Sequence, residues 1–102
     1  MEFAMLRNEI IAKLKEEEPR LRARGVTRLA LFGSVARGEE RPDSDIDVLI
    51  DVDPNVKFTL LDWAGVEADV QELFGRPVEV CRRDRLKPLL RDAIIAEAVD
   101  VF

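Results

Sequence analysis

Two carboxylates, Asp45 and Asp47, lie two residues apart at the start of a predicted strand over residues 46–52. Side chains alternate across a strand, so both point to the same side of it. Carboxylates at this spacing suit a pair of divalent metal ions ~3.5–4 Å apart, and hard oxygen ligands select Mg²⁺ or Mn²⁺. The other interpretation is the solvent face of an edge strand, which Asp51 on the same side slightly favours. The pair alone does not decide between the two.

The dipeptide Gly33-Ser34 follows a short apolar stretch and precedes a predicted turn of helix. Backbone N–H groups at such a turn bind phosphate, and the helix dipole adds to the attraction. Glycine lets the backbone approach a ligand closely, and the Ser34 hydroxyl offers one more donor. An ordinary strand-to-helix turn with Ser34 as N-cap is the other interpretation, and it is the commoner one for this dipeptide alone.

A third acidic residue, Glu79, stands between Val78 and Val80 in a predicted strand. Alternation places the two valines on the opposite face from Glu79. If the valines pack on helices, Glu79 points to the open side of the sheet, where Asp45 and Asp47 also point. Taken alone, Glu79 fits the exposed side of an alternating strand equally well.

The elements that position these residues form one small domain, residues 1–102. Helices are predicted over residues 4–18, 35–37, 58–74 and 88–99, and strands over 27–32, 46–52 and 78–81. Pro19 either interrupts the first helix or starts a further helical turn, which Gly25 would end. The inward face of the 58–74 helix is expected to carry Leu61, Ala64, Ala68 and Phe74. This order predicts a mixed α/β or α+β domain with three or four strands.

Composition narrows the possible chemistry. With 21 acidic and 16 basic residues, the net charge is −5, which opposes an extended nucleic-acid groove because such grooves neutralise phosphates with cations. The absence of histidine and the single cysteine, Cys81, exclude an internal disulfide and the usual zinc ligand sets. No apolar run approaches the ~18 residues of a membrane helix, so we expect a soluble, cytoplasmic protein.

The combined motif is Gly33-Ser34-Val35-Ala36-Arg37-Gly38 followed by Ser44-Asp45-Ile46-Asp47-Val48. It resembles the signature of the DNA-polymerase-beta-like nucleotidyltransferase superfamily, and especially of its minimal nucleotidyltransferase (antitoxin-like) branch. The resemblance implies a small domain with a mixed sheet of three or four strands and helices packed on one side. It also implies binding of a nucleoside triphosphate such as ATP with two Mg²⁺ (or Mn²⁺) ions, and transfer of a nucleoside monophosphate to an acceptor hydroxyl.

The resemblance also assigns roles to single residues. Gly33 and Ser34 would hold the β- and γ-phosphates, and Arg37 would contact phosphate or brace the loop. Ser44 would also belong to the nucleotide-binding residues. Asp45 and Asp47 would ligate metal, and Glu79 would be the third carboxylate. For Arg37 the alternative is a surface ion pair with Glu39 or Asp43. The family usually has Asp at the third position, so Glu79 is a departure by one methylene.

Members of the minimal branch pair with a HEPN-type toxin as its antitoxin, and some transfer AMP to a toxin tyrosine. The resemblance therefore implies a hetero-oligomer, and since this chain has no tyrosine, an acceptor tyrosine would belong to the partner. One alternative is a non-catalytic module that masks its partner through Val99, Val101 and Phe102, which could instead pack on the chain's own core. Another alternative is transfer to a small molecule such as an aminoglycoside.

Overall fold

The computed structural model describes residues 7–39 and 44–102. In chain order the elements are α1 (Arg7–Glu16), α2 (Glu18–Ala23), β1 (Val26–Phe32), α3 (Gly33–Ala36), β2 (Ile46–Val52), α4 (Leu60–Phe74), β3 (Val78–Arg82), a 3₁₀ turn (Arg83–Arg85), α5 (Pro88–Glu97) and β4 (Val99–Asp100). The strands form one sheet in the order β3-β2-β1-β4. β2 pairs antiparallel with β1 and parallel with β3, so the predicted α+β class with a mixed sheet is confirmed.

The parallel pairing of β2 with β3 requires a crossover, and α4 provides it. The helix begins after Thr59, whose side chain accepts from the Asp62 N–H while Asp62 accepts from the Thr59 N–H, and it ends at Gly75 in the left-handed conformation. This cap explains why α4 starts two residues later than predicted. A methyl group on Gly65 would collide with the Arg24 guanidinium, so this mid-helix glycine makes room for an arginine.

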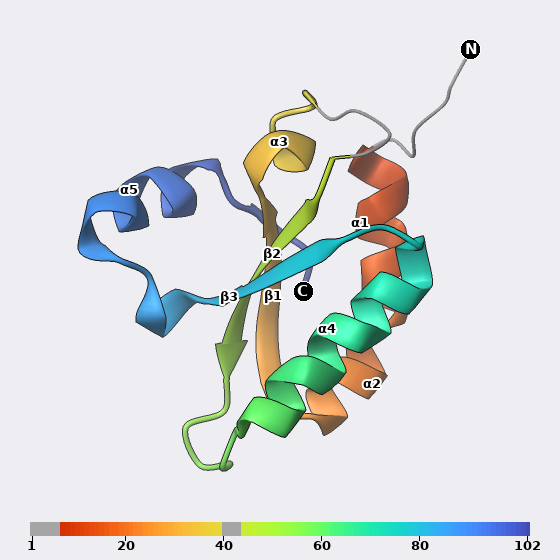
Figure 1. The fold of residues 1–102 in the computed structure, drawn as a ribbon, viewed down its shortest axis with the longest axis vertical. Coiled ribbons are helices and arrows are strands. Elements are labelled where there is room, and N and C mark those ends of the chain that lie inside the picture. The colour runs from red at the N-terminus through yellow and green to blue at the C-terminus, as the bar shows by residue number, and fades with distance from the viewer. Residues whose placement is uncertain (1–6, 40–43) are drawn as a thin grey trace.

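Three helices, α1, α2 and α4, cover one face of the sheet (Figure 1). The prediction that the helices pack on one side holds for these three but not for α5, which packs on the other face. The core beneath them consists of aliphatic side chains that are almost wholly buried: Ile10, Leu14, Leu21, Leu29, Leu31, Ile46, Val48, Ile50, Val66, Val70, Val78 and Val80. Of the predicted inward face of α4, Phe74 is confirmed. Leu61, Ala64 and Ala68 were wrong, because they are exposed, Leu61 by 83%. The stripe that packs on the sheet is formed instead by Trp63, Val66, Val70 and Phe74, which follow the helical period equally well.

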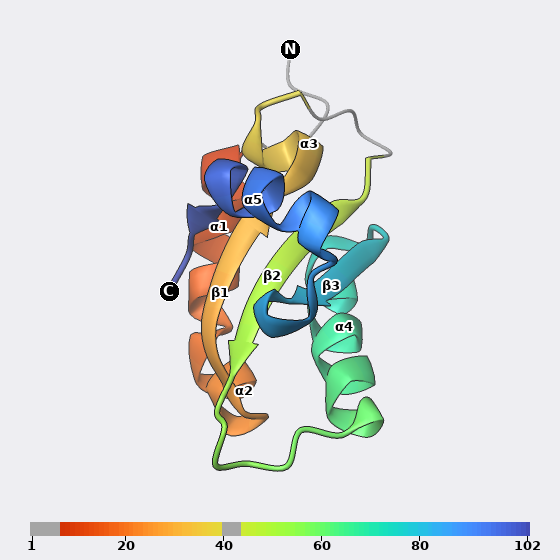
Figure 2. The ribbon, with the colours of Figure 1, turned by 90° about the vertical axis from the view of Figure 1, so that its left-hand side faces the viewer.

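The last helix, α5, lies over the opposite face of the sheet (Figure 2). There Ala30, Phe32 and Leu49 form a smaller cluster, against which Leu86, Cys81, Ile94 and Ala98 pack. No residue of α5 is fully buried, and Leu89 is 96% exposed. α5 is therefore held to the domain by far less apolar contact than α4 is.

The predicted end of the final helix at Val99 was wrong, because α5 ends at Glu97 and Val99 begins β4. Val99 pairs with Leu31 of β1, and the Val101 N–H donates to the Leu29 carbonyl at 2.8 Å. Val101 is buried, and Val99 and Phe102 pack against the main core. These C-terminal apolar residues thus pack on their own domain. A two-residue strand is too short to show alternation in the sequence.

The N-terminal helical region divides into α1 and α2, which agrees with the prediction that Pro19 starts a further turn. Pro19 stands in the first turn of α2, where its missing N–H is harmless. The predicted helix start, with Ala4 and Leu6, lies outside the described residues. Within the ranges the structure describes, no helix is long and apolar enough to cross a membrane.

Candidate active site

The predicted site residues meet at one end of the sheet, where one strand finishes and two others begin. β1 ends at Phe32, and β2 and β3 begin at Ile46 and Val78. Phe32 is paired with Asp47, and Asp47 is paired with Glu79. Because neighbouring strands lie ~4.8 Å apart, the turn after β1, the Asp45/Asp47 pair and Glu79 come together from three separate parts of the chain.

β2 is a central strand, flanked by β1 and β3. The interpretation of the aspartates as the solvent face of an edge strand is therefore wrong. Asp51, on the same side of β2, has a different partner from the others: it accepts from Arg83 Nε at 2.7 Å and lies 3.6 Å from Arg28 Nη1. Its role is an ion pair between β2, β1 and the 3₁₀ turn, away from the Asp45/Asp47 pair.

Gly33 packs directly against Asp47. A methyl group at Gly33 would collide with Asp47 Oδ2 and lie 3.1 Å from Asp47 Cγ, and the backbone there has φ +77°. Only glycine satisfies both conditions at low cost. The N-cap of α3 is Phe32, so the interpretation of Ser34 as N-cap is wrong. Since α3 is one turn long, the donors of this turn are its individual N–H groups rather than an extended dipole.

Asp47 is half-buried, and its pKa is raised to about 6. Burial is the largest cause, followed by the negative charges of Glu79, Asp45 and Glu97, while Arg37 opposes the rise. Four carboxylates therefore share one small region. A bound cation would relieve their mutual repulsion, and oxygen-only donors match Mg²⁺ or Mn²⁺. The donor set at this site fits a divalent metal ion.

Glu79 lies on the face opposite its buried neighbours Val78 and Val80, and thus on the face that carries Asp47. Its Oε1 accepts a hydrogen bond from the Cys81 thiol at 3.6 Å. Burial, together with the Glu79 charge, raises the pKa of Cys81 to about 11, so this thiol is neutral. Among the described residues no three carboxylate or thiol groups lie close enough together to share one metal ion.

Arg37 bridges two acidic residues. Its Nε donates to Glu39 Oε1 and its Nη1 to Glu97 Oε1, both at 3.0 Å. The predicted ion pair with Glu39 is therefore present, whereas Asp43 lies outside the described residues. Glu97 also accepts from the Gly33 N–H at 2.8 Å through Oε2. The sequence analysis missed Glu97, since nothing in its pattern indicates that α5 crosses the open face of the sheet.

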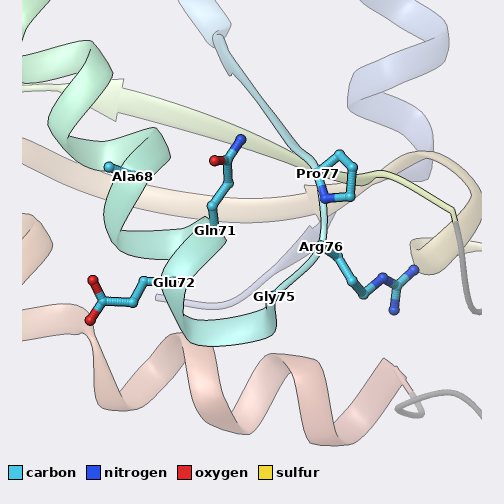
Figure 3. Close-up of a pocket in the computed structure, with 6 residues that line it drawn as sticks. All are labelled: Ala68, Gln71, Glu72, Gly75, Arg76 and Pro77. Carbon is cyan, nitrogen blue, oxygen red and sulfur yellow. The ribbon is translucent and has the colours of Figure 1, made fainter.

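Ser44, next to Asp45, is held through its carbonyl oxygen. Arg76 donates to that oxygen from Nε at 3.1 Å and from Nη2 at 2.6 Å. Arg76 also lines an open hollow of about 520 Å³ at the end of α4 with Ala68, Gln71, Glu72, Gly75 and Pro77 (Figure 3). None of the clustered carboxylates lines this hollow. It is joined to the site through Arg76 and through Pro77, whose carbonyl accepts from the N–H of Ile46, between Asp45 and Asp47. In the sequence, Gly75-Arg76-Pro77 indicates only a helix end.

A second hollow of about 280 Å³ lies between β3 and α5. Its lining includes Phe32, Trp63, Leu86 and Ile94, with Glu79 among the polar residues. It thus joins an aromatic and aliphatic wall to one of the clustered carboxylates. An acceptor group with an apolar body and a polar end fits such a surface.

Residues 7–101 match the family described as the nucleotidyltransferase domain. The chain is 39% identical to "Putative protein adenylyltransferase MJ0435" of Methanocaldococcus jannaschii, covering 93% of this chain and 97% of that protein. It is 33% identical to "Protein adenylyltransferase MntA" of Thermococcus cleftensis, covering 91% and 93% of the two chains.

Among solved structures, "Structure of putative minimal nucleotidyltransferase" superposes with a TM-score of 0.79 at 34% identity, covering 93% of this chain and 95% of that one. A structure named "Crystal structure of the toxin-antitoxin with AMP-PNP" shares the fold, with a TM-score of 0.70 at 14% identity over 86% and 72% of the two chains. The match to the family covers almost the whole chain and includes the motif from Gly33 to Asp47. The chain belongs to the nucleotidyltransferase domain family, among its minimal nucleotidyltransferases, and is an enzyme of that class.

Proposed function

We propose that this nucleotidyltransferase transfers AMP from ATP, with Mg²⁺, to a tyrosine hydroxyl of a HEPN-type toxin, and that it acts as the antitoxin of the pair. The position of Asp47 is the observation that supports nucleotide binding and transfer. It lies against Gly33 on one side and is paired with Glu79 on the other. A phosphate-binding turn, metal ligands and a further carboxylate are the parts that nucleotidyl transfer needs.

Each group has a defined task in the proposed reaction. The Gly33 N–H, the Ser34 hydroxyl and Arg37 bind the β- and γ-phosphates, and the Ser44 segment positions the aspartates. Asp45 and Asp47 would hold two Mg²⁺ ions, and the chemistry these ions would supply is neutralisation of phosphate charge and a lower pKa of the attacking hydroxyl. The acceptor oxygen bonds to the α-phosphorus, the bond from that phosphorus to the bridging oxygen breaks, and pyrophosphate leaves with the electron pair. Glu79 takes the hydroxyl proton or completes the ligand set.

The hollow beside Glu79 supports an aromatic acceptor. Phe32, Trp63, Leu86 and Ile94 offer apolar contact to a ring, and Glu79 offers an acceptor for its hydroxyl. No tyrosine is present in this chain, so such a ring must come from another molecule. The proposal of a protein acceptor is further supported by the names of two relatives, both called protein adenylyltransferases.

Exposed leucines support a protein partner. Leu60 and Leu61 at the start of α4 are each 83% exposed, and Leu89 of α5 is 96% exposed. The C-terminal residues Val101 and Phe102 pack on the domain's own core instead, so the partner surface is expected on α4 and α5. The name of the structural neighbour with AMP-PNP describes a toxin-antitoxin complex, which is consistent with this role.

The test is incubation with α-labelled ATP, Mg²⁺ and the product of the neighbouring gene, followed by electrophoresis and mapping of the labelled residue. We expect a labelled partner tyrosine, and no label with an Asp45→Asn/Asp47→Asn variant or in EDTA. A stable complex that never carries label would favour the non-catalytic masking role. Label only on a small-molecule acceptor would favour the third alternative.

A further inference from the structure

We propose that Glu97 is an internal competitor of the triphosphate. In the free enzyme its carboxylate binds the Gly33 N–H and Arg37, the proposed phosphate-binding donors, and it must leave them before the nucleotide can bind. This inference rests on the proposed function, because it assigns the Gly33 N–H and Arg37 to the phosphates. It adds that the chain carries its own anion for those donors.

The hydrogen bonds of Glu97 carry the argument. Oε2 accepts from the Gly33 N–H at 2.8 Å, and Oε1 accepts from Arg37 Nη1 at 3.0 Å. One carboxylate thus spans a backbone donor and a guanidinium, as two oxygens of a phosphate would. The N–H has only one hydrogen, so a phosphate cannot use it fully while Glu97 does.

The position of Glu97 is also costly for the site. Glu97 accepts from the N–H of Gly33, the residue that packs directly against the Asp47 carboxylate, so its charge lies close to the proposed metal ligands. A triphosphate arriving with its cations would meet this extra negative charge. Removal of the carboxylate therefore improves phosphate binding in two ways: it frees two donors and it removes a repulsion.

The helix that carries Glu97, α5, is held to the sheet by few apolar contacts. α5 has no fully buried residue, and its Ile94 is only partly buried against the smaller cluster on the sheet. Glu97 is the last residue of the helix, directly before Ala98 and β4. A change of its side-chain rotamer withdraws the carboxylate without disturbing the main core.

The experiment measures dissociation constants by calorimetry for two probes, MgATP and tripolyphosphate, on the whole chain. We expect Glu97→Gln and Glu97→Ala to bind tripolyphosphate about tenfold more tightly than wild type, as the loss of a competing charge-assisted contact implies. Asp92→Asn, which removes one exposed charge from the same helix, is the matched control and is expected to stay within twofold. Circular dichroism confirms that each variant is folded.

Glu97→Asp distinguishes occupancy of the Gly33 and Arg37 donors from simple charge repulsion. The shorter arm keeps the negative charge but cannot reach both donors, so occupancy predicts tighter binding in this variant as well. Wild-type affinity in Glu97→Asp together with tighter binding in Glu97→Gln would overturn the proposal and leave only a long-range charge effect. Weaker MgATP binding in Glu97→Gln would also overturn it, because that result identifies Glu97 as a metal ligand.

Different results would contradict the competitor role of Glu97 and the proposed function. If wild type binds MgATP and the Asp45→Asn/Asp47→Asn variant does not, while all Glu97 variants match wild type, only the competitor role is wrong. If neither wild type nor any Glu97 variant binds either probe, the proposed function fails, and the competitor role fails with it.

Discussion

Asp47 and Glu79 are directly paired residues on the parallel strands β2 and β3, and both side chains lie on the face of the sheet opposite the main helical layer. Two carboxylates on adjacent strands at the same level repel each other unless a cation or a proton lies between them. The site therefore stores unfavourable electrostatic energy in the absence of metal, and this energy is measurable.

The first prediction concerns stability and pH. The pKa of Asp47 is raised from 3.8 to about 6, so the folded state binds this proton more tightly than the unfolded state does. The stability from that proton is fully present below pH 3.8 and is lost as the pH rises through about 6. In EDTA at pH 7.5 we expect Asp47→Asn to be more stable than wild type by roughly 1 kcal/mol after allowance for solvent screening, or about 4–8 °C in Tm.

Thermal melts of wild type and Asp47→Asn between pH 4 and pH 8 check this expectation, and the gap should shrink toward low pH. Asp51→Asn is the control from the same strand. It removes the 2.7 Å contact with Arg83 and should lower Tm at neutral pH. An Asp47→Asn protein that melts below wild type at pH 7.5 would contradict the account of stored repulsion.

The second prediction isolates the contact between Gly33 and Asp47. Gly33 and Gly38 have nearly the same φ, +77° and +75°, but a methyl group at Gly38 meets nothing within 4 Å. Gly38→Ala therefore carries only the backbone strain, about 1 kcal/mol, whereas Gly33→Ala adds displacement of the Asp47 carboxylate. We expect both variants to be destabilised, but only Gly33→Ala to lose MgATP affinity, by tenfold or more. Equal affinities in the two variants would show that Asp47 tolerates the methyl group.

The third prediction concerns Glu79. If it activates the acceptor, Glu79→Gln should leave ATP affinity within a few-fold and cut transfer by roughly 10²-fold or more. Glu79→Asp should retain or raise transfer, because it restores the usual family residue. Cys81→Ala is a useful companion, since it frees the Glu79 carboxylate from the thiol and should leave transfer intact. Undiminished transfer by Glu79→Gln would reduce Glu79 to the polar side of a strand.

The fourth prediction concerns Arg76 as a positioning residue. Its two bonds to the Ser44 carbonyl fix the backbone just before Asp45. Arg76→Lys keeps the charge but loses the paired donors, so we expect a several-fold weaker apparent affinity for Mg²⁺ with the maximal rate of transfer largely retained at saturating metal. Titration of Mg²⁺ at fixed ATP measures this. Arg22→Lys, whose arginine forms an exposed ion pair with Glu18 within α2, is the control, and an identical Mg²⁺ response in the two variants would refute the positioning role.

Much of this site was predictable from sequence because its parts are local. Alternation along a strand is enough to place Asp45 and Asp47 together and to set Glu79 opposite Val78 and Val80. The glycine at position 33 is visible as the residue that ends an apolar strand. What periodicity does not contain is which strands become neighbours, so the pairing of Asp47 with Glu79 came from the structure.

The residues that sequence reasoning missed act across long distances in the chain. Glu97 and Arg76 are ordinary polar residues at helix ends, and only the fold brings them to Gly33 and Ser44. The inward face of α4 was misassigned in part: Leu61, Ala64 and Ala68 were expected there with Phe74, whereas Trp63, Val66 and Val70 join Phe74 on the core. The short β4 was missed since two residues are too few for a pattern.

The pairing of β4 with β1 has a consequence for the order of folding. β1 and β2 are consecutive strands, and β3 joins them through α4, whereas β4 must bring the segment after α5 back to Leu31. Contacts between distant parts of a chain form late, because the loop that joins them must first be closed. We therefore expect the Gly33 turn and Asp47 to assemble while β4 is still unpaired. During refolding the Gly33 N–H would then be free of Glu97 for a time, a state that the native enzyme reaches only by moving the Glu97 side chain away.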